Sequence, residues 1–181
     1  MWMRQLDNPE ADTCVAGIRL SPAVPGKGGE ALRILGCDPS SSKIGLCLLE
    51  ADDVRYTTVK VEPAKAGRGF PPRVNKAAGE CASWVGVTPD LVAIEAPFQK
   101  WARATTAISW VAGVLARTFG VTEVRTVANK AWKRAATGNG NASKEQVMRC
   151  LQAQGYRPPD EHTASALGVA LFAQSRYGGQ R

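Results

Sequence analysis

The chain has 181 residues, of which 44% are hydrophobic and 22% charged, and it carries a formal net charge of +7 at pH 7. These proportions are typical of one soluble globular domain with a sizeable core. No apolar run approaches the length of a membrane span, which excludes a membrane-spanning protein, and we expect no membrane partner.

The amino-terminal segment and the cysteines favour a cytoplasmic protein. Acidic residues appear by Asp7 and no apolar stretch follows, so we expect no secretory signal. The five cysteines form no Cys-x-x-Cys pair and are odd in number, which favours reduced thiols over a disulfide framework or a zinc site. Residues 1–30 include the run GKGGE and predict a flexible arm, residues 31–177 form the predicted folded domain, and residues 178–181 are a tail.

The first predicted elements are three strands. An apolar run over residues 32–38 ends at Asp38, and a second run over residues 44–49 follows a Pro-Ser-Ser-Ser turn, which predicts a hairpin of two core strands. Residues 54–62 alternate between apolar and polar side chains and are rich in residues that favour strands, so we predict a third strand there.

The remaining predicted elements alternate helices with two further strands. They are, in order, a helix over residues 74–86, a buried strand within 89–97 that ends at Glu95, a helix from Gln99 to Thr118, a strand over 122–127, a short helix with Lys130, Trp132 and Lys133, a helix between its cap Ser143 and Gly155, and a last helix after Pro159. Three antiparallel strands followed by αβ units predict an α/β fold, with a mixed five-stranded sheet and helices on both faces.

Two acidic residues stand at the ends of predicted strands, Asp38 on the first and Glu95 on the fourth. If these strands are neighbours, both carboxylates lie at the same edge of the sheet, where open α/β sheets bind ligands. Carboxylates held close together repel each other unless a cation lies between them, and Mg²⁺ prefers oxygen ligands. The alternative is that each acid only starts a turn. That explanation suits Asp38-Pro39 alone, but it suits Glu95 less well because buried strands seldom end in an unpaired acid.

The positive charge is concentrated in the second half of the chain. Residues 96–150 hold nine basic and two acidic residues, so this segment alone accounts for the net charge. Solvated helix faces are one explanation, but nearby glycines and aromatic residues favour nucleic acid. The loop TGNGNASK at 137–144 offers backbone amides and Lys144 beside a helix start, which suits either a phosphate cradle or a flexible connection. Phe98 lies beside Lys100 and Arg103, an arrangement that stacks on unpaired bases while the cations hold phosphates.

These pieces, in this order, resemble the RuvC family of Holliday-junction resolvases, within the ribonuclease H-like superfamily. The segment ILGCDPSSSKIGLCLLE is similar to the family's first strand and its Asp-Pro-Gly-Ser turn, with Ser40 in place of the glycine. VAIEAPF resembles the second acidic strand, and KRAATGNGNASKEQV matches the family's most specific segment. The last helix resembles the closing motif D/H-x-x-D-A-L-x-x-A, and the resemblance covers about residues 32–176.

The resemblance implies a homodimeric, Mg²⁺-dependent endonuclease, with Mn²⁺ as a substitute ion, that nicks two strands of like polarity across a four-way DNA junction. It implies that Asp38 and Glu95 are metal ligands and that His162 is a ligand or a general acid or base. It also implies that the helix over residues 99–118 pairs with its twin. An apolar stripe of Ile108, Val111, Val114 and Leu115 suits that contact, but a stripe at this spacing is as often part of the core. The residues that we expect to contact DNA are Phe98, Lys100, Arg103, Lys130, Lys133, Arg134, Asn139 and Lys144, with Lys133 and Lys144 at the scissile phosphate.

The chain departs from the family pattern at Ser165, where the family usually has aspartate. Glu161 lies four residues earlier on the same helix face and is one candidate for the missing acid. Asp160 is a second candidate. Both acids also suit an ordinary helix start, because carboxylates stabilise the first turn. The third possibility is an impaired metal site.

Three functions follow from these alternatives. The first is a nuclease that resolves four-way junctions, and the second is a protein of the same fold that binds branched DNA without cutting it efficiently. The third is an actin-like ATPase, which also begins with an acid-bearing hairpin. It is disfavoured because that fold needs two such domains and a far longer chain.

Overall fold

The computed structural model describes residues 32–40, 42–51, 53–62, 70–96, 102–120 and 123–178, with the backbone alone at 70–71 and 102–108. The predicted flexible arm at residues 1–30 and nearly all of the predicted tail lie outside the described residues.

The described part of the chain contains a five-stranded mixed sheet with the strand order β3-β2-β1-β4-β5. The strands are β1 (Arg33–Pro39), β2 (Lys43–Glu50), β3 (Asp53–Lys60), β4 (Leu91–Glu95) and β5 (Val124–Val127). The first three strands pair antiparallel, whereas β4 pairs parallel with both β1 and β5. The predicted mixed sheet is therefore confirmed, and β1 and β4, which carry the two acids, are neighbours.

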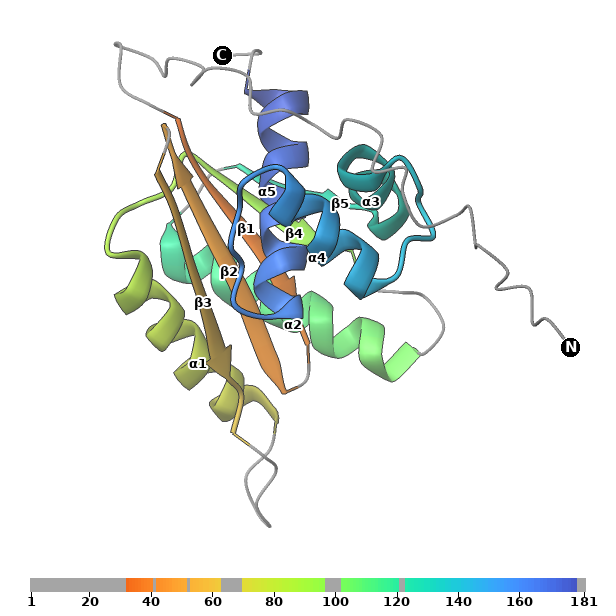
Figure 1. The fold of residues 1–181 in the computed structure, drawn as a ribbon. Helices are drawn as coiled ribbons and strands as arrows, with labels where there is room; N and C mark the ends of the chain where they lie inside the picture. The colour runs from red at the N-terminus through yellow and green to blue at the C-terminus, as the bar shows by residue number, and fades with distance from the viewer. Residues whose placement is uncertain are drawn as a thin grey trace, which may run out of the picture.

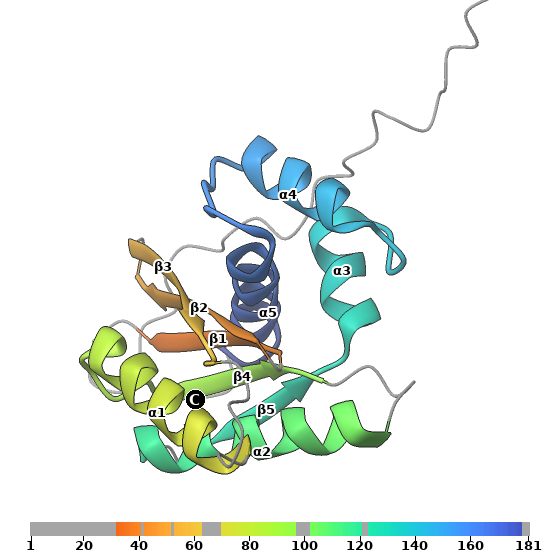
Figure 2. The same cartoon turned by 90° about the horizontal axis from the view of Figure 1, so that it is seen from below.

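Helices cover both faces of the sheet (Figures 1 and 2). On one face lie α1 (Phe70–Val85) and α2 (Ala102–Phe119), and on the other lies α5 (Glu161–Tyr177), flanked by α3 (Asn129–Thr137) and α4 (Lys144–Ala153). Among the described helices, none is both long and apolar enough to cross a bilayer.

Helix α1 begins at Phe70, four residues before the predicted start. The sequence there suggested a loop because it contains Pro71 and Pro72. Proline is tolerated in the first turn of a helix, where its missing amide hydrogen has no intrahelical acceptor. The loop prediction is therefore wrong over this turn.

Two buried clusters fill the spaces above and below the sheet, and alternation along each strand decides which cluster a side chain joins. Ile34, Leu91 and Ala93 pack against α5, α3 and α4. Leu35, Cys37, Val92 and Ile94 pack instead against α1 and α2.

The predicted dimer stripe on α2 is partly core. Val111 and Leu115 are fully buried in the cluster between the sheet and α1, so of the two explanations the core one holds for these two residues. Helix periodicity alone does not distinguish a core stripe from an interface stripe. Trp110 on the same helix is 48% exposed, so pairing through another face of α2 stays a prediction.

The cysteines only partly follow the sequence expectation. Cys37, Cys47 and Cys81 are free, buried thiols, as expected for small side chains in a core. Cys150 on α4 is disulfide-bonded, so the expectation of reduced thiols is wrong at this position.

Glycines in β1 and β2 let α5 lie unusually close to the sheet. A Cβ atom on Gly36 would come within 2.8 Å of the Ala170 Cβ, and one on Gly45 would come within 2.8 Å of the His162 Cβ and closer still to its backbone carbonyl. Real Cβ atoms essentially never approach so closely, so the depth at which α5 packs depends on these two glycines.

We expect Gly45→Ala to lower the free energy of unfolding by about 1–3 kcal/mol, because the added methyl group must push the first turn of α5 off the sheet. Urea denaturation measures this change. The matched control is Gly79→Ala on α1, where a Cβ would meet nothing within 4 Å. There the substitution should raise stability by about 0.4–1 kcal/mol. Equal stability of Gly45→Ala and wild type would contradict this account.

Candidate active site

The carboxylates of Asp38 and Glu95 lie side by side at the carboxyl ends of β1 and β4. The parallel register pairs Cys37 with Ile94, so the next residue of each strand is one of the acids. Cys37 and Ile94 point toward α1 and α2, and therefore Asp38 and Glu95 point toward α5.

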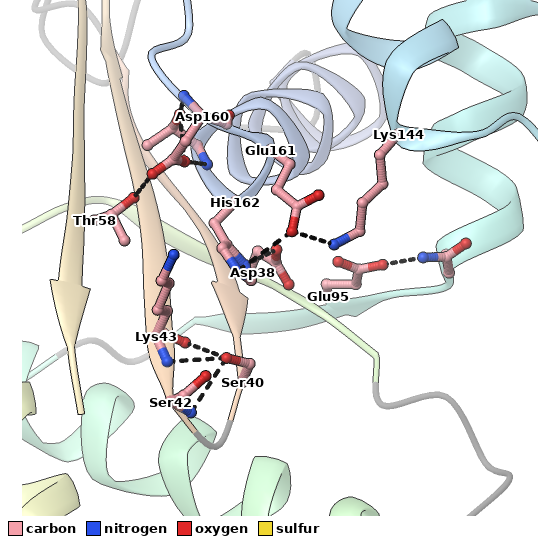
Figure 3. A network of polar contacts seen from close by, with 12 residues as sticks. Asp38, Ser40, Ser42, Lys43, Thr58, Glu95, Lys144, Asp160, Glu161 and His162 are labelled. Atoms are coloured by element: carbon pink, nitrogen blue, oxygen red, sulfur yellow. Dashed lines mark hydrogen bonds and ion pairs between the residues drawn. The ribbon is translucent and has the colours of Figure 1, made fainter. Parts of the chain in front are cut away.

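The two acids share a cavity of about 240 Å³ between the sheet edge, α3, α4 and α5. Its lining residues are Asp38, Pro39, Ser40, Glu95, Ala96, Asn129, Trp132, Lys133, Lys144, Val147, Glu161, His162 and Ser165. Residues from five elements, β1, β4, α3, α4 and α5, therefore meet at one place, and Figure 3 shows how the charged ones lie there.

Two side chains of α3 hold Glu95. Asn129 donates a hydrogen bond from its Nδ2 to Glu95 Oε1, and the Trp132 Nε1 donates to the same oxygen over 3.3 Å. Trp132 is itself fixed, because its ring is buried against Gly168 of α5, where a Cβ would lie 2.7 Å from Cζ3. Both donors bind the same oxygen of Glu95, Oε1, and so fix the orientation of its carboxylate.

Sequence reasoning missed Asn129 and Trp132 as site residues. The signal that could have found them is the strand order. Val127 of β5 pairs with Glu95, and α3 begins at Asn129, two residues later. A polar side chain just beyond a strand that neighbours an acid-bearing strand is a candidate for the same site.

Burial is the largest cause that raises the pKa of Glu95, to about 7, and the charge of the adjacent Asp38 and a hydrogen bond with it contribute in the same direction. The bonds from Asn129 and Trp132 act in the opposite direction. The two carboxylates therefore resist ionising together, as expected for like charges at close range.

His162 binds Asp38 from the first turn of α5. Its Nδ1 lies 3.0 Å from Asp38 Oδ2, and Gly45, the β2 residue opposite Asp38, leaves room for the His162 backbone. The hydrogen bond to Asp38 raises the pKa of His162, although burial partly opposes it. In the neutral ring, donation from Nδ1 to Asp38 would leave the lone pair on Nε2.

Glu161 and Lys144 continue this series of contacts. Glu161 Oε1 lies 2.8 Å from Lys144 Nζ and 3.8 Å from His162 Nε2, and the side chains of Glu161 and Lys144 are each 50% exposed. Asp38, His162, Glu161 and Lys144 thus form a continuous row of polar contacts in Figure 3. Ser165 lines the same cavity and is buried.

Asp160 does not reach the cavity. It is the N-cap of α5, where its Oδ1 accepts from the Thr163 amide over 2.8 Å and its Oδ2 accepts from the Thr58 hydroxyl over 2.7 Å. Both oxygens are engaged on the far side of the helix start from Glu161, next to β3 (Figure 3). Of the two acids considered as replacements at Ser165, the structure brings only Glu161 to the cavity.

The donor set fits a divalent cation in part. Asp38 and Glu95 supply two hard oxygen ligands, and their mutual repulsion is the situation that a cation relieves. Among the described residues, however, no three His, Cys, Asp or Glu side chains are grouped as a ligand set. The place where a third acid is expected holds Ser165, and Glu161 is bound to Lys144 instead.

One lysine of α3 and one of α4 line this cavity. They are Lys133 and Lys144, and Lys133 Nζ also donates to the carbonyl of Ala142 over 3.0 Å. Lys130 and Arg134 are exposed on α3. Phe98 and Lys100 lie outside the described residues, as does the side chain of Arg103.

The loop between α3 and α4 is not an open backbone cradle. The amides of Gly138, Asn139, Asn141, Ala142 and Ser143 all donate within the loop and its flanking helices. Asn139 is exposed, and its Oδ1 accepts from the Asn141 amide. The expectation of free phosphate-binding amides is therefore wrong for these five, and the cations remain as the candidate phosphate ligands.

Comparison with solved structures shows which known proteins share this fold. The chain is similar to Thermus thermophilus RuvC, whose structure was also solved in complex with a Holliday junction substrate. The complex aligns with a TM-score of 0.64 at 24% identity over 82% of this chain and 96% of that chain. A second structure, of Thermus thermophilus RuvC, aligns with a TM-score of 0.61 at 25% identity over 82% of this chain and 98% of that chain.

Comparison of the sequences identifies the family. The family described as "Crossover junction endodeoxyribonuclease RuvC" matches residues 34–172. A relative of that name from Synechococcus sp. (strain RCC307) is 30% identical over 78% of this chain and 98% of its own length. Another, from Christiangramia forsetii, is 34% identical over 76% and 77%. The chain belongs to the RuvC family, and the resemblance seen in the sequence is confirmed.

The raised pKa of Glu95 predicts a pH-dependent stability in buffer without divalent cations. Glu95 holds its proton more tightly in the folded chain (pKa about 7) than in the unfolded chain (4.5). Stability is therefore greatest below about pH 4.5 and falls as the pH rises through 7, by about 2–4 kcal/mol for this group.

Urea denaturation of wild type and Glu95→Gln at pH 5 and pH 8, in chelated buffer, isolates the contribution of Glu95. The difference between the two free energies of unfolding should grow in favour of Glu95→Gln at the higher pH, because glutamine does not ionise. The raised pKa of His162 acts in the same direction in both proteins. A wild-type-to-variant difference that does not change with pH would contradict the raised pKa.

Proposed function

We propose that this protein is an Mg²⁺-dependent endonuclease that resolves four-way DNA junctions by paired phosphodiester hydrolysis, and that it acts in the cytoplasm of a bacterial cell. The observation that carries the proposal is the pair Asp38 and Glu95, which share one cavity at the ends of adjacent parallel strands. Membership of a family named for crossover junction cleavage supports the substrate class.

Asp38 and Glu95 are the residues that would hold the ion, with Mn²⁺ as a substitute. A divalent cation bound there supplies a Lewis acid that lowers the pKa of water and stabilises charge on phosphate oxygens. Asn129 and Trp132 fix the Glu95 carboxylate in advance, because both donate to its Oε1. Preorganised ligands of this kind cost little reorganisation when the substrate binds.

We propose that His162 acts as the proton acceptor of the site. Its Nδ1 is committed to Asp38, which leaves the Nε2 lone pair free to take the proton of an attacking water. The phosphate would be held by Lys133 and Lys144, the two lysines that line the cavity, with Lys130, Arg134 and Asn139 further along the DNA. Phe98, Lys100 and Arg103 stay proposed DNA contacts from the sequence.

A symmetrical junction needs two cuts and each chain has one such cavity, so we propose a homodimer formed through residues 99–118. Trp110 of α2, 48% exposed, supports an exposed apolar contact on that helix. It lies beside Val114, Arg117 and Thr118, which line a shallow groove with Asn75 of α1.

A second function is favoured by Ser165, which occupies the place of an acid. In agreement with this, no three metal-ligating side chains are grouped in the described part of the chain. A protein with this site would bind branched DNA and cut it slowly or not at all. The same cleavage experiment separates the two functions, because it measures binding and nicking on one substrate.

Incubation of a synthetic four-way junction with the protein and Mg²⁺ should give symmetrical nicks in two strands of like polarity. We expect Glu95→Gln to reduce the rate by at least about a hundredfold, because it removes a charged ligand of the ion. In a mobility shift, the variant should still bind the junction, which controls for folding. Efficient nicking excludes the binding-only function. Binding without nicking by wild type, in Mg²⁺ and in Mn²⁺, would overturn the nuclease proposal.

Junction binding should weaken steeply as salt rises, because Lys and Arg side chains release counterions from the phosphates. Replacing Arg134, exposed on α3, with glutamine should lower the slope of log affinity against log salt by about 1. The matched control is Arg176→Gln at the opposite, carboxyl-terminal end of α5, where no change in slope is expected. Equal slopes for Arg134→Gln and wild type would remove α3 from the DNA-binding surface.

A further inference from the structure

We propose that Glu161 is the third acid of the metal site in place of the residue missing at Ser165, and that Lys144 restrains it until a substrate phosphate binds the lysine. The inference rests on the proposed metal-dependent function. Beyond that function, it means that the metal site is incomplete in the free protein and that the binding of metal is coupled to the binding of DNA.

Position is the first argument for Glu161. It lines the cavity together with Asp38, Glu95 and Ser165. It also lies four residues before Ser165 on the same face of α5, and its side chain is one methylene group longer than that of aspartate. A carboxylate that starts one turn away therefore lines the same cavity as an acid at position 165 would.

The second argument is what holds Glu161 now. Its Oε1 is 2.8 Å from Lys144 Nζ, and the grouping of three donors that a metal ion needs does not occur among the described residues. Without a cation, a third carboxylate beside Asp38 and Glu95 is repelled, and the Lys144 ammonium balances it instead. The lysine pair thus explains why the ligand set is incomplete in this structure.

The third argument is that this pair is easily exchanged. Both side chains are 50% exposed, and ion pairs as exposed as this contribute little to stability. Lys144 also lines the cavity, so a phosphodiester that enters it competes with Glu161 for the same ammonium group. When phosphate binds Lys144, the Glu161 carboxylate is released to the ion. By thermodynamic linkage, DNA binding then strengthens metal binding and metal binding strengthens DNA binding by the same factor.

The test measures Mn²⁺ affinity of the DNA-free protein by the loss of the free-ion signal in electron paramagnetic resonance. Lys144→Met should tighten Mn²⁺ binding, because Glu161 is released. Glu161→Gln alone should change it less than about twofold. In the Lys144→Met background, however, Glu161→Gln should weaken binding about fivefold, which is the size expected for freeing one exposed ion pair.

Two control variants separate this effect from a general loss of positive charge. Lys133→Met removes the other lysine that lines the cavity, whose ammonium binds the Ala142 carbonyl and not Glu161. In that background, Glu161→Gln should have the same small effect as in wild type. Ser165→Asp restores an acid at the family position, and there Glu161→Gln should lose its effect even with Lys144→Met.

A second measurement tests the role of phosphate. Affinity for a four-way junction is compared in chelated buffer and in Ca²⁺, which takes the same oxygen ligands. Ca²⁺ should tighten wild-type binding about fivefold, and Glu161→Gln should abolish this gain. A gain that survives Glu161→Gln would overturn the coupling.

The outcomes separate failure of the inference from failure of the proposed function. If Glu95→Gln binds Mn²⁺ as tightly as wild type, the acids of the cavity hold no metal, and the proposed function fails together with the inference. If Glu95→Gln weakens binding but Glu161→Gln has the same effect with and without Lys144, the metal site stands and Glu161 is not its third acid.

Discussion

The repulsion between Asp38 and Glu95 is the constraint around which the other polar residues of this cavity are arranged. The sheet places the two carboxylates on adjacent parallel strands, on the same face and at the same end. Each is then satisfied from a different side, Asp38 by His162 of α5 and Glu95 by Asn129 and Trp132 of α3. Even so, burial and the neighbouring charge raise the pKa of Glu95 to about 7. Two carboxylates held this close are costly for the fold, and the cation proposed for this cavity would relieve their repulsion.

Close packing delivers the partners of these acids. Gly45 lies opposite Asp38 in the hairpin and leaves space for the backbone of His162, while Gly168 of α5 leaves space for the ring of Trp132. Helix α5 therefore positions a partner for each carboxylate. His162 of α5 itself binds Asp38, and Trp132, which packs against Gly168 of α5, binds Glu95. The distances at the site follow from backbone approach and not from flexible side chains, which is how a fold holds reactive groups in a fixed geometry.

Charge balance at the start of α5 is the feature that distinguishes this chain from the family pattern. A serine at position 165 removes one negative charge from the interior of the site, and Glu161 returns one at its half-exposed rim. An acid at the rim is accessible to a lysine, whereas an acid in the interior is not. In the proposed metal site, moving the acid by one helical turn would make its availability to the ion depend on what Lys144 binds.

Local pattern in the sequence was sufficient for the strands and for the acids, because alternation places Asp38 and Glu95 at strand ends whatever else the chain does. The family resemblance added His162. Tertiary structure decided the rest. Asp160 and Glu161 are adjacent in sequence and both suit a helix start, but only the approach of Thr58 on β3 draws Asp160 away from the cavity. Asn129 and Trp132 became site residues through the pairing of β5 with β4, and Val111 became core through the packing of α2 on α1. Such choices depend on which elements lie against each other, and periodicity along one element does not contain that information.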